Sequence, residues 1–191
     1  MKKIAKDFKD SVKEFKNTRS LAVIAMLLAL AVILGFFSVQ VTETLKISFA
    51  FLANELTGML FGPFVGLIEG AAADILKYLV KPTGPFFPGF TISGMLSGLI
   101  YGLMLYKKPI TLKRVITANA IVTVFVNMLL NTYWLTLLYG KGFAVIFPAR
   151  IVKEAILLPI DIALFYTLSK VLEKANVFKS FRSGIEKAPT V

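Results

Sequence analysis

Two short segments of this chain combine residue types that bind planar, negatively charged small molecules. Residues 81–90 hold three phenylalanines among prolines and glycines, which exclude regular structure there. Residues 131–134 and 150–153 supply an amide, aromatic rings and two cations on either side of a glycine-flanked loop. Aromatic rings stack on planar ligands and cations pair with carboxylates. The candidate ligand-binding residues, including one cation and one glycine close to the first segment, are Lys77, Phe86, Phe87, Gly89, Phe90, Asn131, Tyr133, Trp134, Arg150 and Lys153.

Five carboxylates interrupt the apolar runs, where each would cost about 2.5–3.5 kcal/mol or more facing lipid. We expect them to face an interior, a cavity or a partner charge; Asp74 and Lys77, three residues apart, could pair on one helical face. Arg150 and Lys153 lie where no orientation signal calls for cations, which favours an anionic ligand. The five are Glu55, Glu69, Asp74, Glu154 and Asp161.

A polar stripe recurs every fourth residue at Asn119, Thr123, Asn127 and Asn131. Such a stripe bonds neighbouring helices or lines a wet pocket. We expect Asn119 and Thr123 to serve packing and Asn131 to reach a ligand. The nearby Trp134 and Tyr133 have a simpler alternative explanation as an interfacial aromatic belt.

Several kinds of chemistry are excluded by composition. Cysteine and histidine are both absent, which removes thiol catalysis, disulfides, zinc sites built on Cys or His, and histidine bases. No Walker A pattern occurs, so this chain is not expected to hydrolyse ATP. We expect no catalytic residue, metal or cofactor.

The composition is that of an integral membrane protein. Of the 191 residues, 57% are hydrophobic and 17% are charged, too few charges to cover a soluble domain. A bilayer core of roughly 30 Å needs about 20 apolar residues per helix. The fold class is therefore an all-α membrane protein. The net charge of +11 suits an orientation signal, and nucleic acid is not an expected partner.

The apolar runs predict a bundle of six transmembrane helices. The run Ile47–Val80 is too long for one span and divides at Gly62-Pro63, since glycine suits a helix end and proline a first turn. The expected spans are 21–39, 47–61, 63–80, a fourth ending near 106, 115–138 and 148–172.

Charge orients these six spans. Both termini, the 62/63 turn and the 107–114 loop share one side, which the positive-inside rule places in the cytoplasm. Residues 1–19 form a basic amphipathic segment at the membrane surface, with Phe8, Val12 and Phe15 on one face. Residues 20–173 form the membrane domain, and 174–191 a basic cytoplasmic tail. The cations on the opposite side are Lys46, Lys77, Lys81, Arg150, Lys153 and Lys141.

Small residues at intervals of four predict close helix packing. We expect internal packing for the two glycine series, which are Gly58, Gly62, Gly66 and Gly70, and Gly94, Gly98 and Gly102. Ala25 and Ala29, with Ala22 nearby, lie on the first span and could instead dock another membrane subunit.

Residues 73–93 (ADILKYLVKPTGPFFPGFTIS), 131–135 (NTYWL) and 150–153 (RIVK) resemble the substrate-binding S component of energy-coupling factor (ECF) transporters, and specifically its folate-specific members. The resemblance covers about 20–172. It implies a bacterial cell-membrane protein that captures a vitamin at the outer face without ATPase activity of its own. It also implies partnership with a transmembrane coupling subunit, which would meet Ala25 and Ala29, and with two ATP-binding cassette subunits. The family is thought to topple in the membrane to deliver its ligand.

Folate, or a reduced folate, agrees with the residues. Its pterin would stack on Trp134 or Phe86 and bond Asn131, while its glutamate carboxylates would pair with Arg150, Lys153 or Lys77.

Three alternatives stay open. The ligand could be another vitamin, although cationic thiamin would want acidic outer loops. An intramembrane aspartyl protease would need two facing carboxylates, and Glu69 and Asp74 do not share a helical face. A packing subunit without a ligand would not need the aromatic 81–90 loop.

Overall fold

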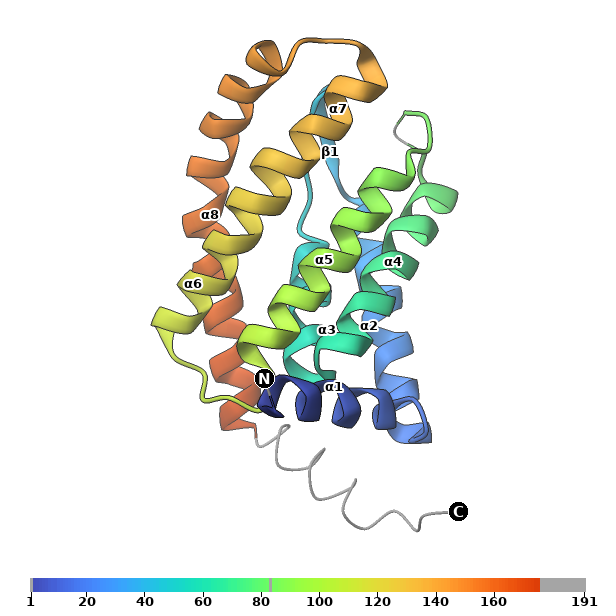
Figure 1. Ribbon diagram of the computed structural model, residues 1–191, viewed down its shortest axis with the longest axis vertical. Helices are drawn as coiled ribbons and strands as arrows, with labels where there is room; N and C mark the ends of the chain where they lie inside the picture. The colour runs from blue at the N-terminus through green and yellow to red at the C-terminus, as the bar shows by residue number, and fades with distance from the viewer. Residues whose placement is uncertain (1, 83, 176–191) are drawn as a thin grey trace.

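The apolar runs fold into helices that stand side by side, with one short helix across their lower end (Figure 1). The structure is a computed structural model and describes residues 2–82 and 84–175. Its elements in order are α1 (Lys2–Glu14), α2 (Thr18–Phe36), β1 (Val39–Thr42), β2 (Leu45–Ile47), α3 (Phe51–Phe61), α4 (Pro63–Val80), α5 (Pro88–Leu105), α6 (Leu112–Ile121), the π-helical η1 (Val122–Leu130), α7 (Asn131–Tyr139) and α8 (Phe143–Lys174).

A β-hairpin replaces the ends of the first two predicted spans. The prediction that the first span reaches residue 39 was wrong, because α2 ends at Phe36 and Val39 pairs with Ile47 in antiparallel strands. The second helix likewise begins at Phe51 and not at residue 47. β-Branched residues favour extended backbone here, and the Thr42 hydroxyl accepts a hydrogen bond from the Leu45 amide at 3.1 Å to close the turn.

The predicted tight turn at Gly62-Pro63 is confirmed. Gly62 has a φ of 92°, which side chains disfavour, and α4 begins at Pro63. Ser11 of α1 completes this turn: its hydroxyl donates to the Phe61 carbonyl at 2.6 Å and accepts from the amides of Phe64 and Val65 at 3.1 Å. Helix α1 thus caps the start of α4.

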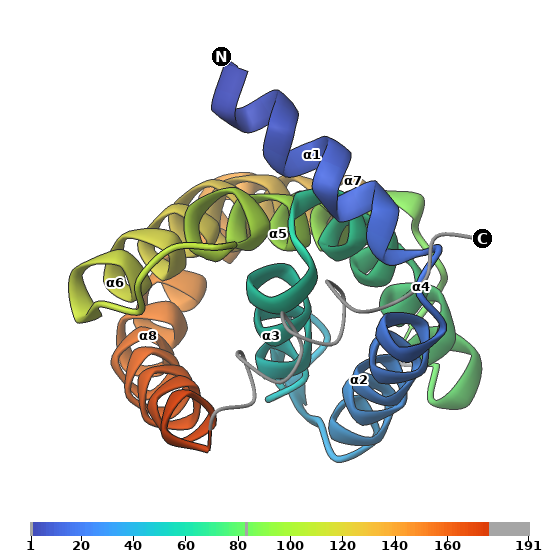
Figure 2. The same cartoon turned by 90° about the horizontal axis from the view of Figure 1, so that it is seen from below.

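Helix α1 meets the bundle through a polar edge. Asp7, Ser11 and Glu14 are its buried residues, whereas Val12 is exposed. Phe15 packs edge-on against Phe64 at 6.0 Å between ring centroids. Seen from below, α1 crosses the end of the bundle (Figure 2). Within the segment 1–19, the residues from Lys2 to Glu14 therefore form a helix, with Val12 exposed and the ring of Phe15, just after it, against the bundle. Its place at a membrane surface stays a prediction.

Helices α4 and α5 touch backbone to backbone along the glycine seam, which we define as Gly66, Gly70, Gly94 and Gly98. A Cβ added to Gly98 would lie 1.9 Å from the Gly66 carbonyl oxygen, and one added to Gly70 would lie 2.2 Å from the Gly94 carbonyl oxygen. No side chain fits at either distance, so the packing predicted for both glycine series is confirmed.

Helix α3 lies inside an arc formed by α2, α4, α5, α6 and α8 (Figure 2). The main apolar cluster packs the second half of α3 against α5, α6 and α8. It includes Met59, Leu105, Val115 and Phe165. Apolar packing is thus concentrated at the end of the bundle nearest α1.

Four helical stretches of the described chain are long and apolar enough to cross a membrane. They are α2, α5, the continuous helix 112–139 and α8. Helix α3 has only 11 residues, and α4 carries Glu69, Asp74 and Lys77 within its 18. The last helix begins at Phe143, five residues before its predicted start, since Pro148 is accommodated inside it. The protein is a mainly helical membrane protein with large apolar side chains such as Met26, Phe125 and Ile156 exposed on its surface. The predicted tail 174–191 lies, from residue 176 on, outside the described residues.

Candidate functional site

A cavity of about 380 Å³ opens between the hairpin and the ends of the helices that lie away from α1 (Figure 1). This volume is typical of small-molecule sites. Its walls come from the β1–β2 hairpin, α3, α4, the 81–90 segment, α5, the continuous helix 112–139 and α8. The cavity therefore collects residues from nearly the whole membrane domain.

Two contacts bring the loops together over the mouth. Lys141, before α8, pairs with Glu43 at the hairpin tip at 2.7 Å, and its hydrogen bond lowers the pKa of the Glu43 carboxyl. Gly84, with a φ of 110°, lies so close to the Tyr139 hydroxyl that an added Cβ would be 2.9 Å from it. The hairpin and the 81–90 segment are each tied to the α7–α8 corner.

Most of the predicted binding residues line this cavity: Lys77, Phe86, Phe87, Phe90, Asn131, Arg150 and Lys153. The other three lie beside it. Trp134 donates its indole N–H to the Ser93 hydroxyl at 3.2 Å and packs on Phe87 at 5.7 Å between centroids. Gly89 leaves room for that indole, since a Cβ there would be 2.5 Å from it. Tyr133 is half exposed on the outside of α7. Trp134 thus supports the aromatic wall from behind.

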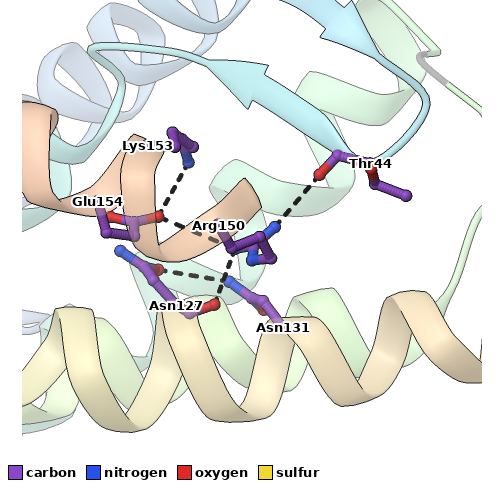
Figure 3. Close-up of polar contacts among 6 residues, drawn as sticks. All are labelled: Thr44, Asn127, Asn131, Arg150, Lys153 and Glu154. Carbon is purple, nitrogen blue, oxygen red and sulfur yellow. Dashed lines mark hydrogen bonds and ion pairs between the residues drawn. The ribbon is translucent and has the colours of Figure 1, made fainter. Parts of the chain in front are cut away.

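Arg150 is the hub of the polar wall formed by α8 and the continuous helix (Figure 3). It is 6% exposed and donates to the backbone carbonyls of Asn127 at 2.7 Å and Thr44 at 3.4 Å. Glu154 lies 3.9 Å from Arg150 and 3.0 Å from Lys153. The sequence predicted that Arg150 and Lys153 bind an anion; the structure adds that they share one carboxylate, so the three side chains together retain one positive charge.

Several polar atoms on the cavity lining have no hydrogen-bond partner in the described part of the chain. They include Asn131 Oδ1, Asn54 Oδ1 and Arg150 Nε. Buried polar atoms are nearly always satisfied, so these unpartnered atoms set the residues around the cavity apart from an ordinary packed interior. Asn131 also donates its amide to Asn127 Oδ1 at 3.3 Å.

Three further cations converge at the hairpin side: Lys46, Lys77 and Lys81. The predicted Asp74–Lys77 pair is not among the ion pairs of the described residues; Asp74 accepts instead from the Thr91 hydroxyl at 2.8 Å. This side of the cavity is crowded with positive charge.

The inner end of the cavity is made of hydroxyl, amide and carboxylate groups. Tyr101, Asn119, Thr123 and Asp161 line it. Asn119 also donates to Glu55 Oε1 at 2.6 Å. The expectation that Asn119 serves helix packing is therefore only half of its role, since it faces the cavity as well.

The hairpin residues that line the cavity were missed by the sequence reasoning. Gln40, Thr44 and Lys46 lay in what was treated as a polar stretch between spans. The alternation of polar and β-branched residues over 39–47 was the available signal.

Over residues 2–82 and 84–175, no group of three or more acidic side chains lies close enough together to hold a metal ion.

Ala22, Ala25 and Ala29 all lie exposed on one face of α2. Their neighbours Met26 and Ile33 are 62% and 54% exposed. This side of the helix faces away from the bundle.

Comparison with known proteins agrees with this architecture. The family described as "ECF transporter, substrate-specific component" matches residues 19–169. The chain belongs to this family. Because its members are substrate-specific transporter components, the prediction that this chain is not an enzyme is confirmed. Helix α1 precedes the matched region.

Two folate transporters and one riboflavin transporter are among the relatives of this chain. The folate transporter FolT of Clostridium novyi is 41% identical over 142 residues, covering 74% of this chain and 82% of the relative. That of Leuconostoc mesenteroides is 33% identical over 158 residues, covering 80% and 85%. A crystal structure of FolT bound with folic acid superposes with a TM-score of 0.75 at 41% identity, covering 80% of this chain and 93% of that one. A riboflavin transporter of Staphylococcus aureus, RibU, is 26% identical over 179 residues.

Proposed function

We propose that this ECF S component binds folate in its outer cavity and delivers it inward. The observation that carries the proposal is the clustering of Lys46, Lys77 and Lys81, with the net cation of the Arg150 group, around one small-molecule cavity. Folate carries two carboxylates on its glutamate tail, which such cations would bind. The 41% identity to a FolT bound with folic acid supports the same ligand.

The aromatic wall suits the rings of the ligand. Phe86, Phe87 and Phe90 line the cavity from the 81–90 segment, and Tyr78 supports Phe86 at 5.1 Å between centroids. Planar rings stack on such faces. Phe86 is the proposed stacking partner for the ligand on this wall. Trp134 does not face the ligand itself but packs behind Phe87 and holds that ring in place.

Binding is tested directly with purified protein. Trp134 is the chain's single tryptophan and touches Phe87, so its fluorescence is expected to change when folic acid enters. Riboflavin and thiamin serve as competitors: neither carries a carboxylate, and neither is expected to displace folic acid. Displacement by riboflavin at equal concentration would overturn the ligand assignment.

We propose six membrane crossings in the cell membrane, with both termini in the cytoplasm. The hairpin and α3 together would make the second crossing and α4 the third. The chain has no cysteine, so single cysteines can be introduced and probed with an impermeant maleimide on intact cells. Lys141→Cys is expected to react and Lys113→Cys to stay unlabelled; the reverse pattern would refute the orientation.

We propose that delivery needs an ECF transmembrane coupling subunit and two ATP-binding cassette subunits. The exposed face of Ala22, Ala25 and Ala29 would meet the coupling subunit, as small residues allow close helix approach. ATP-dependent uptake by vesicles, present with the partner subunits and absent without them, is the expected result.

A further inference from the structure

Glu55 is a fully buried carboxyl group that the binding proposal does not use. It is 0% exposed, does not line the cavity, and has one carboxylate oxygen, Oε2, without a hydrogen-bond partner among the described residues. A carboxyl placed in an apolar interior is costly, and an aliphatic side chain of similar size would be expected to stabilise the bundle more.

The other oxygen of Glu55 holds Asn119. Asn119 Nδ2 donates to Glu55 Oε1 at 2.6 Å and to the Val115 carbonyl at 3.2 Å. A backbone carbonyl only accepts, so the amide nitrogen must point this way and Asn119 Oδ1 must point the other way.

The orientation of the Asn119 amide determines the direction of its hydrogen bond with Tyr101. Tyr101 donates its hydroxyl to Asn119 Oδ1 at 3.3 Å, which commits the Tyr101 proton. The oxygen of Tyr101 then keeps only acceptor capacity, and Tyr101 lines the cavity together with Asp161. The inner end of the cavity therefore presents hydrogen-bond acceptors at Tyr101 and Asp161, beside the Thr123 hydroxyl, which can also accept.

We propose that Glu55 is a positioning residue which, through Asn119 and Tyr101, fixes an acceptor-rich inner end that selects a ligand whose leading group donates hydrogen bonds. The inference rests on the proposed function: in folate, the amino- and N–H-bearing edge of the pterin is that donor group. The carboxylate tail then remains at the lysine side of the cavity. Without Glu55, the Asn119 amide nitrogen would keep only its 3.2 Å bond to the Val115 carbonyl, which holds it less firmly. If the amide turned, its nitrogen would face Tyr101, and the Tyr101 hydroxyl would be released to point a donor at the pterin donors.

The test compares two probes, folic acid and N-(4-aminobenzoyl)-L-glutamate, which is the tail without the pterin. Glu55→Leu is expected to weaken folic acid binding about 10- to 100-fold, because each lost or reversed buried hydrogen bond costs about that much. Binding of the tail fragment should change less than about twofold, since it does not reach this end. Glu55→Gln keeps an acceptor for Asn119 and should restore affinity to within about fivefold of wild type.

Glu69→Leu is the matched control. Glu69 is also buried, at 2% exposed, and both its oxygens lack partners in the described chain, but it does not line the cavity or touch Asn119. Its folic acid affinity should equal wild type. Equal losses in both leucine variants, an equal loss for both probes, or no loss in Glu55→Leu would each overturn the positioning role.

Tyr101→Phe provides a second route should Glu55→Leu fail to fold. It removes only the hydroxyl, and about tenfold weaker folic acid binding with unchanged tail-fragment binding is expected. Unchanged folic acid binding would overturn the proposal. Wild-type protein that binds no folic acid would instead refute the proposed function itself.

Discussion

The Arg150 guanidinium donates a hydrogen bond to the backbone carbonyl of Asn127 at 2.7 Å, joining α8 to the π-helical segment η1 (Figure 3). A π-helix has wider turns than an α-helix and often occurs at functional sites. The bond joins two walls of the cavity, so Arg150 stabilises the fold at the place where we propose that folate binds.

Replacement of Arg150 by alanine is therefore expected to lower both stability and folic acid affinity. Loss of charged hydrogen bonds to two carbonyls should cost about 1.5–3 kcal/mol. Lysine keeps the charge without the planar fork, so Arg150→Lys should recover part of the affinity and little of the stability. Thermal unfolding in detergent and isotopic folate binding measure the two effects. Lys141→Ala, which breaks an exposed pair, should cost less than about 1 kcal/mol.

The aromatic support is tested by Trp134→Ala. Loss of the indole leaves Phe87 without its packing partner and Ser93 without its donor, so folic acid affinity should fall about tenfold. Isotopic folate binding measures this, with Leu137→Ala as the exposed residue of the same helix that should leave affinity unchanged. Wild-type affinity in both Trp134→Ala and Arg150→Ala would refute the proposed site.

The glycine seam predicts a position-specific intolerance of one methyl group. Gly98→Ala would put Cβ 1.9 Å from the Gly66 carbonyl oxygen, forcing α4 and α5 apart and costing at least about 2 kcal/mol. Gly142→Ala is the control, because its nearest contact would be 3.9 Å and its φ is −58°. Yield of monodisperse protein and its melting temperature should separate the two; equal melting temperatures would contradict the seam.

Ser11 should matter more than an ordinary exposed serine. Ser11→Ala removes three hydrogen bonds at the start of α4 and is expected to cost about 1–2 kcal/mol, as loss of a helix cap does. Thr117→Ala, whose hydroxyl bonds only its own helix, should cost less than about 0.5 kcal/mol. Proteolysis within residues 2–17 would report release of α1.

Docking of α1 should also depend on pH through Asp10. Its hydrogen bond to Lys107 at 2.8 Å lowers the Asp10 pKa from 3.8, against an opposing effect of burial. A lowered carboxyl pKa means stability that is present above pH 3.8 and lost as pH falls through the folded-state value. Asp10→Asn should therefore be less stable than wild type by up to about 1 kcal/mol at pH 7, and the difference should vanish as the pH falls below the folded-state pKa of Asp10. Burial raises the Glu14 pKa, an effect of opposite sign that both proteins share.

The exposed alanines of α2 separate binding from transport. Ala25→Trp should block close approach of another helix while leaving the cavity intact, since Ala25 faces away from the bundle. Uptake with the partner subunits should be lost with folic acid affinity unchanged. Ile156→Trp, 61% exposed on α8, is the control for bulk alone. Normal uptake by Ala25→Trp would argue against this docking face.

Local sequence patterns predicted the structure correctly where residues close together in the chain determine it. Gly62-Pro63 predicted its turn, and the glycine spacing predicted the α4–α5 contact, because both depend on residues close in sequence. The sequence showed that Arg150, Lys153 and Glu154 share one helical face. It did not show that Glu154 neutralises one of the two cations. The hairpin escaped prediction because apolar β-branched residues at its ends continue the hydropathy of the spans.

Depth within the cavity could not be predicted from sequence. Asn119 and Asn131 belong to the same stripe, yet the first meets Glu55 from α3 and the second meets Asn127 of its own helix. Which neighbour an amide meets depends on how α3 is placed inside the arc, and that is a tertiary property. Trp134 likewise lies behind the wall because Gly89 admits its ring.

The close contact along the glycine seam has a consequence for motion. A small slide of α4 along α5 would drive backbone atoms into each other where Gly66, Gly70, Gly94 and Gly98 meet, because carbonyl oxygens already occupy the space of the missing side chains. We therefore expect the two helices to move together, with Asp74 and Ser93 held at fixed positions relative to each other on the cavity wall. Any opening or closing during a transport cycle is then left to the hairpin, the 81–90 segment and α8.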